Sequence, residues 1–213
     1  FDVDYDNPMM TVITFREVDE SAVAEGVYGP EQLGRFQDVS SGTFAFDFIE
    51  KLGASGITSG CGGGEFCPTA VVTRAELAVV LERGINGSTF CPPPATGTVF
   101  GDVGAGDFAA NFIEQLAADG ITAGCCGGNY CPNAVVTRDQ MAVFLLRAKY
   151  GPGYSPPAAT VVFGDVATGR FAAALIEQLA AEGITSGCGG VNDFPGADVT
   201  RDQMDVFLVR TFG

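Results

Sequence analysis

Three arginines recur at equivalent places in this chain, and each follows a threonine that is typical of a helix start. The motif Val72-Thr73-Arg74 returns as Val136-Thr137-Arg138 and as Val199-Thr200-Arg201. A helix N-terminus already carries about half a positive charge, so a cation there is unfavourable by roughly 0.3–1 kcal/mol. Free helix N–H groups beside a guanidinium would, however, form a site for a carboxylate or a phosphate. The pattern therefore allows two interpretations. The first is an anion site between neighbouring repeats of the chain, with the arginines and three equivalent aspartates, Asp38, Asp102 and Asp165, as candidate binding residues. The second is an internal ion pair between each arginine and one of these aspartates.

The seven cysteines are the other residues whose side chains could form covalent bonds or bind a metal. Cys61 and Cys67 enclose five residues, and Cys125 and Cys131 have the same spacing. Equal spacing in an exported chain predicts one local disulfide in each loop. For the rest we expect a Cys91–Cys126 bond, with Cys188 free or intermolecular. A zinc site is the weaker alternative because the chain has no histidine and no C-x-x-C spacing, so we expect no metal and no cofactor.

Composition narrows the function classes. The net charge of −15 argues against nucleic acid and anionic membranes as partners, and no apolar run is long enough for a membrane-spanning helix. Without histidine a histidine-containing catalytic triad cannot form, and no acidic pair lies in a motif with a nucleophile or base, so we do not expect an enzyme. The chain begins at Phe1 without methionine, and we expect an export signal to have been removed. These features favour a secreted, extracellular or cell-envelope protein.

Internal repeats organise most of the sequence. The F-x-D-V segments that contain Asp38, Asp102 and Asp165 are 64 and 63 residues apart, and Gly56-Ile57-Thr58 returns at Gly120 and Gly183. Each repeat has the pattern of helix, glycine-rich loop, helix; in the second repeat the first helix is expected over Phe108–Ala118. Three capping boxes are predicted at the second helices. The expected units are a leader (1–35), a first repeat (36–90), and two further repeats with Pro-rich linkers (91–150 and 151–213).

These repeats resemble the S-layer homology (SLH) domain. The resemblance rests on the F-x-D-V entry, the G-I-T-x-G turn and the Thr73-Arg74-Ala75-Glu76 signature, although Asp139-Gln140 and Asp202-Gln203 replace Ala-Glu in the later copies. The family implies a mainly α, pseudo-threefold bundle of three repeats. It also implies noncovalent anchoring to a cell-wall glycopolymer or peptidoglycan, often pyruvylated, and favours the anion-site interpretation for at least one groove.

The sequence of the leader (1–35) indicates a contact between copies of the chain. Its residues 11–15 are mostly β-formers, which favours a strand, and helical repeats offer that strand no sheet edge. We therefore expect it to pair with another copy of the chain, so that the alternative function is a structural subunit of a surface layer, tube or filament. The residues expected in this subunit contact are Thr11, Val12, Ile13, Thr14 and Phe15.

Overall fold

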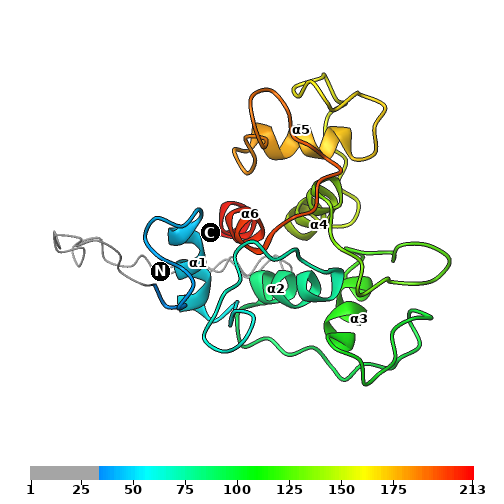
Figure 1. The fold of residues 1–213 in the computed structure, drawn as a ribbon. Helices are drawn as coiled ribbons and strands as arrows, with labels where there is room; N and C mark the ends of the chain where they lie inside the picture. Colours follow the sequence, from blue (N-terminus) through cyan, green and yellow to red (C-terminus); the bar gives the residue numbers. More distant parts are fainter. Residues whose placement is uncertain (1–33) are drawn as a thin grey trace, which may run out of the picture.

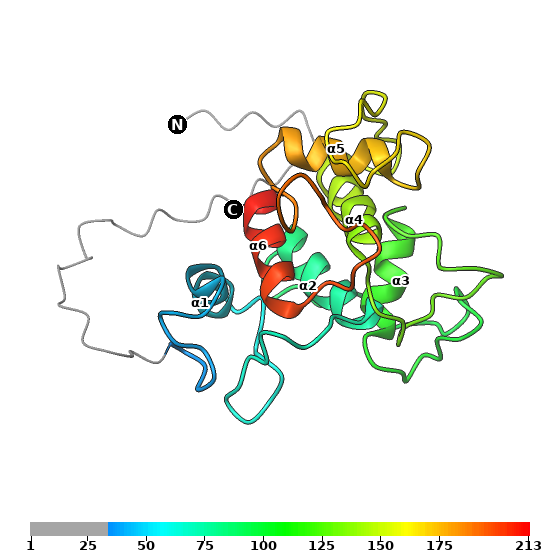
Figure 2. The ribbon, with the colours of Figure 1, turned by 45° about the horizontal axis from the view of Figure 1, so that its top comes forward.

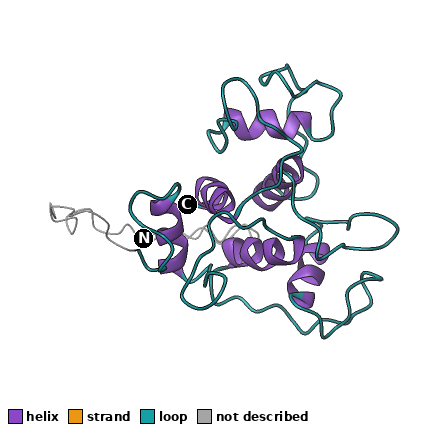
Figure 3. Ribbon diagram, viewed as in Figure 1, coloured by secondary structure: helices purple, strands orange, loops and turns teal. Residues whose placement is uncertain are grey.

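The computed structural model describes residues 34–213, so the predicted strand at 11–15 lies outside the described part. Within that part six helices follow one another and no sheet forms, only isolated bridges (Figures 1 and 3). The expected mainly helical fold is therefore confirmed for residues 34–213. The helices are α1 (Phe46–Ser55), α2 (Arg74–Asn86), α3 (Ala110–Ala118), α4 (Arg138–Tyr150), α5 (Ala173–Ala181) and α6 (Arg201–Phe212).

The second helices of the three repeats lie towards the middle of the molecule and the first helices lie outside them (Figures 1 and 2). Helix α2 packs on α3, and α4 packs on α5. Helix α6 packs on α1, so the last repeat contacts the first and the circle closes. One apolar core runs through all three repeats, because a single two-helix unit cannot cover its own apolar stripe.

Three valines mark the centre of this pseudo-threefold arrangement. Val72 donates its N–H to the carbonyl of Val199, Val199 donates to Val136, and Val136 donates to Val72, each at 2.9 Å. All three side chains are fully buried. These bonds pair buried backbone groups that water does not reach. They join the three repeats at the residue before the threonine that precedes each second helix.

Two expectations about helix ends need correction. Helix α3 begins at Ala110 rather than Phe108, because Ala109 adopts a left-handed φ of 59° directly before it. Only Thr73 forms a capping box, with Glu76. Thr137 and Thr200 accept no capping bond; each donates its hydroxyl to the aspartate two residues later.

The Pro-rich linkers are held on the first helices by single glutamates. Glu114 accepts the backbone N–H groups of Thr96 and Gly97 at 2.8 and 2.7 Å. Glu177 does the same for Thr160 and the two residues that follow it. The N–H groups that Glu114 accepts lower the pKa of its carboxyl. Burial opposes ionisation of Glu177, but the N–H groups that it accepts dominate and lower its pKa as well. The linkers are therefore fastened parts of the bundle.

Candidate functional site

Three equivalent grooves lie between the repeats. Each is lined by the turn after a first helix and by the second helix of the same repeat. A neighbouring repeat supplies an arginine from the start of its second helix, and we name each groove by this arginine. The first repeat takes its arginine from the third repeat. The Arg74, Arg138 and Arg201 grooves enclose about 390, 340 and 310 Å³.

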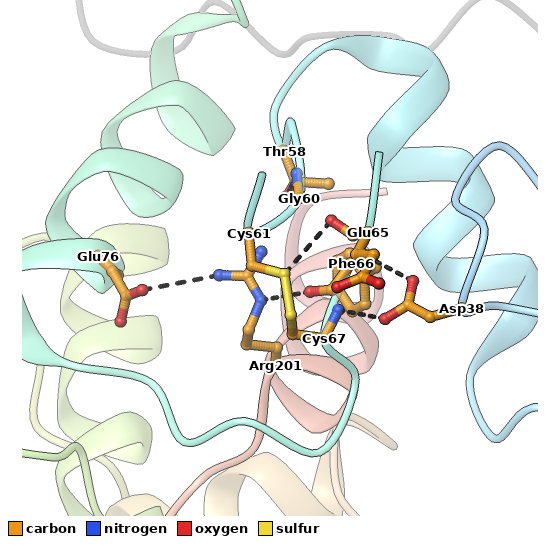
Figure 4. Close-up of a disulfide and its surroundings, with 9 residues drawn as sticks. All are labelled: Asp38, Thr58, Gly60, Cys61, Glu65, Phe66, Cys67, Glu76 and Arg201. Atoms are coloured by element: carbon orange, nitrogen blue, oxygen red, sulfur yellow. Dashed lines mark hydrogen bonds and ion pairs between the residues drawn. A yellow bond between two sulfur atoms is a disulfide. The ribbon is translucent and has the colours of Figure 1, made fainter. Parts of the chain in front are cut away.

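The three arginines are buried, with 5, 5 and 7% of their surface exposed. Each Nε donates to a loop carbonyl of another repeat: Arg74 to Tyr130 at 2.8 Å, Arg138 to Asp193 at 2.7 Å, and Arg201 to Phe66 at 2.8 Å. Figure 4 shows the third of these bonds beside the loop disulfide. The arginines thus connect the repeats in a circle, and sequence reasoning did not find these partners.

The backbone N–H groups at the starts of these helices are also occupied. Arg74 donates its N–H to the carbonyl of Ala134, and Ala75 donates to Pro132. The same pairs of bonds recur at the starts of α4 and α6. The expectation that free helix N–H groups would bind an anion is therefore wrong at these two positions of each helix, and the guanidinium is the group that remains for a ligand.

The three repeated aspartates hold loops and line none of the grooves. Asp102 accepts the backbone N–H groups of Tyr130 and Cys131 at 2.7 and 2.8 Å, and Asp38 and Asp165 make equivalent pairs of bonds. Burial opposes ionisation of Asp102 and Asp165, but the N–H donors dominate and lower the pKa of both carboxyls. Within residues 34–213 no ion pair joins these aspartates to the repeated arginines, so the ion-pair interpretation is wrong.

The grooves differ in how the arginine charge is balanced. In the Arg138 groove, Asp193 lies 2.6 Å from the guanidinium. In the Arg201 groove, Glu76 lies at 3.8 Å (Figure 4). In the Arg74 groove no carboxylate of residues 34–213 forms an ion pair with the guanidinium.

No carboxylate of the described residues lies within ion-pair distance of Arg74, and Asp102 acts on its charge only from farther away. Its guanidinium lies over the rings of Tyr130 and Phe144, with centroids at 4.6 and 5.2 Å. Its Nη2 is buried and has no hydrogen-bond partner, and the same is true of Oε1 of Gln140 in the same groove. Burial lowers the pKa of Arg74, but a guanidinium stays protonated in proteins. One unsatisfied donor and one unsatisfied acceptor therefore lie in this groove.

A second arginine and an exposed phenylalanine complete each groove. Arg147 lies in the Arg74 groove and donates to the carbonyl of Ile121 at 3.3 Å. Phe171 also lines this groove and is 62% exposed. Equivalent pairs line the other two grooves, namely Arg210 with Phe44, and Arg83 with Phe108. All three phenylalanines are largely exposed.

The loop disulfides form as the spacing predicts, Cys61 with Cys67 and Cys125 with Cys131. The expected Cys91–Cys126 bond is wrong, because both residues are unpaired and exposed. The sulfur of Cys126 instead lies 3.8 Å from that of Cys125. Cys188 is also unpaired.

Comparison with known proteins gives a family and surface-layer relatives. The S-layer homology domain matches residues 35–78 and 99–142. The surface-layer 125 kDa protein of Lysinibacillus sphaericus is 28% identical over 84% of this chain and 15% of its own length. An endoglucanase of Bacillus sp. (strain KSM-635) is 30% identical and an amylopullulanase of Thermoanaerobacterium thermosulfurigenes is 34% identical, each over 53% of this chain.

The chain spans only a small part of these relatives, between 6 and 15% of their lengths. Among the described residues, no helix has the length and hydropathy needed to cross a membrane.

Proposed function

The chain belongs to the S-layer homology domain family, and we propose that its Arg74 groove anchors it by binding an acidic sugar polymer of the cell wall. The family and its surface-layer relatives make this a cell-surface protein. S-layer homology domains are non-catalytic anchoring modules. The observation that carries the finer proposal is the buried guanidinium of Arg74, whose Nη2 has no partner and whose charge no carboxylate of the described residues pairs with.

A carboxylate or phosphate on the polymer would satisfy this guanidinium. Leaving a buried donor unsatisfied costs about 1–3 kcal/mol, and more for a charged group, so a ligand oxygen that pairs with it recovers that free energy. A planar guanidinium also suits a two-oxygen anion better than an ammonium does.

The rest of the groove suits a sugar ring. The exposed ring of Phe171 offers an apolar face, and the free Oε1 of Gln140 can accept a bond from a hydroxyl. Arg147 supplies a second cation on the same helix as Gln140. The volume of about 390 Å³ falls within the range usual for small-ligand sites.

The test is sedimentation of the pure chain with isolated cell-wall sacculi. Arg74→Ala should abolish co-sedimentation and Arg74→Lys should restore it only in part, because the ammonium cannot form two parallel bonds. Arg201→Ala is the matched control, since that arginine already lies near Glu76; it should retain most of the binding. A thermal melt of each variant verifies folding, and unchanged binding by folded Arg74→Ala would refute the proposal.

A further inference from the structure

The loop of the second repeat brings three sulfur atoms together. Cys125 and Cys131 form its disulfide, and Cys126 is unpaired and exposed. The sulfur atoms of the three residues all lie within 4.8 Å of one another. A thiol in this position has a disulfide within reach, which is the starting arrangement for thiol–disulfide exchange.

The backbone at Cys126 differs from that of its equivalents. Gly62 and Gly189 occupy this place in the other repeats, with φ of 112° and 154°. Cys126 has no positive φ, although its carbonyl still accepts the N–H of Asn129 at 2.8 Å and closes the same turn. The turn is thus kept while a side chain is accommodated, and that side chain lies beside the disulfide.

We propose that Cys126 and Cys125 exchange places as the disulfide partner of Cys131. Cys126 loses its proton to solvent, and its thiolate attacks the sulfur of Cys131. The Cys125–Cys131 bond breaks, the Cys126–Cys131 bond forms, and Cys125 leaves as a thiolate that takes a proton from solvent. One disulfide and one thiol are present before and after the step, so no oxidant or reductant is consumed.

Attack on the other sulfur is disfavoured by geometry. It would join Cys125 to Cys126, whose Cα atoms are about 3.8 Å apart across a trans peptide. Disulfides usually join Cα atoms about 4.4–6.8 Å apart. Cys131 is therefore the shared partner, and the two neighbouring cysteines compete for it.

The exchange changes the Arg74 groove. Cys125 and Cys131 line this groove, and Cys126 is not among its lining residues. When Cys126 holds Cys131, the loop is fastened one residue further along the chain and the thiol of Cys125 is released in the groove. The loop of the second repeat thus has two covalent states, whereas the first repeat, with Gly62, has one.

Peptide mapping of the unreduced chain tests this. The chain is incubated near pH 8.5, where about half of an ordinary thiol is ionised, over the minutes to hours that such rearrangements take. It is then quenched and alkylated with N-ethylmaleimide. We expect the adduct on Cys125 in one population and on Cys126 in the other, with Cys131 linked in both. An adduct confined to Cys126 after prolonged incubation would overturn the proposal.

A thiol count gives a second test with a matched control. The structure has three unpaired cysteines, Cys91, Cys126 and Cys188, so the wild-type chain should have three free thiols after oxidative refolding. Cys125→Ser should have two, because Cys126 takes over Cys131, whereas four would contradict us. Cys61→Ser in the first repeat should have four, because Gly62 offers no substitute for the lost partner of Cys67. If Cys125→Ser fails to refold, the wild-type mapping still decides the question.

Discussion

Replacing Asp205 with alanine should stabilise the protein in a pH-dependent way. This residue of α6 is fully buried, and neither of its carboxylate oxygens has a hydrogen-bond partner. Alanine occupies the equivalent place in the other repeats, at Ala78 and Ala142, so the substitution Asp205→Ala restores the side chain that this position has elsewhere in the bundle.

The magnitude follows from the ionisation of this carboxyl. Burial raises the pKa of Asp205 from 3.8 to about 8, with Arg201 opposing the shift and Asp202 adding to it. The folded state therefore holds a proton between pH 4 and 8 that the unfolded chain releases. Stability is lost as the pH rises through this range, at up to about 1.4 kcal/mol per pH unit, which amounts to at most about 4 kcal/mol at pH 7.

Urea unfolding under non-reducing conditions at pH 5 and pH 8 measures the effect. We expect Asp205→Ala to be more stable than the wild type at pH 8 by about 2–4 kcal/mol, and the difference to shrink at pH 5. Other titrating groups are common to both proteins, so the change in this difference with pH belongs to Asp205. Equal pH dependence of the two proteins, or a less stable variant at pH 8, would refute the reasoning.

Two further substitutions test the packing of the bundle. Burial raises the pKa of Glu82 to about 8, with Asp119 adding to the shift. Leucine occupies the equivalent place in the second repeat, at Leu146. Glu82→Leu should therefore raise the urea midpoint of unfolding at pH 8 more than at pH 5. Glu114→Ala should expose the N–H groups of residues 96 and 97, so the amide hydrogen exchange of these two residues should become faster. Exchange in the linker that Glu177 binds should stay unchanged. Equal exchange rates at residues 96 and 97 in the wild type and the variant would contradict the role of Glu114 in holding the linker.

The repeats and the starts of the second helices could be predicted from the sequence because both depend on local residue patterns. The periods of 64 and 63 residues and the Thr-Arg pairs are visible in the sequence, and α2, α4 and α6 begin at those arginines. The start of α3 was predicted wrongly because Ala109 adopts a left-handed conformation, which is typical of glycine and is not expected for alanine. As a result Phe108 lies before the helix and is exposed in a groove.

The partners of the repeated arginines could not be predicted because they are set by the closed circle of repeats. Arg201 donates to the carbonyl of Phe66, 135 residues earlier in the chain. One loop position, occupied by Phe66, Tyr130 and Asp193 in turn, carries a carboxylate only in the third repeat, where it balances Arg138. Arg201 is balanced instead by Glu76 of α2. Only the fold reveals that this loop position faces an arginine of the neighbouring repeat. The leader strand and the contact between copies that it suggested stay predictions, since residues 1–33 lie outside the described part.

Exchanging the residues at that loop position tests the account most directly, with binding to isolated sacculi as the measurement. Tyr130→Asp places a carboxylate beside Arg74, as Asp193 lies beside Arg138, and should abolish binding while the arginine itself remains. Asp193→Tyr frees Arg138 and should add a second binding groove, so that saturation requires about twice the amount of polymer per chain. Binding that is lost in Tyr130→Asp and gained in Asp193→Tyr is the result we predict; folded variants that both bind as the wild type does would contradict it.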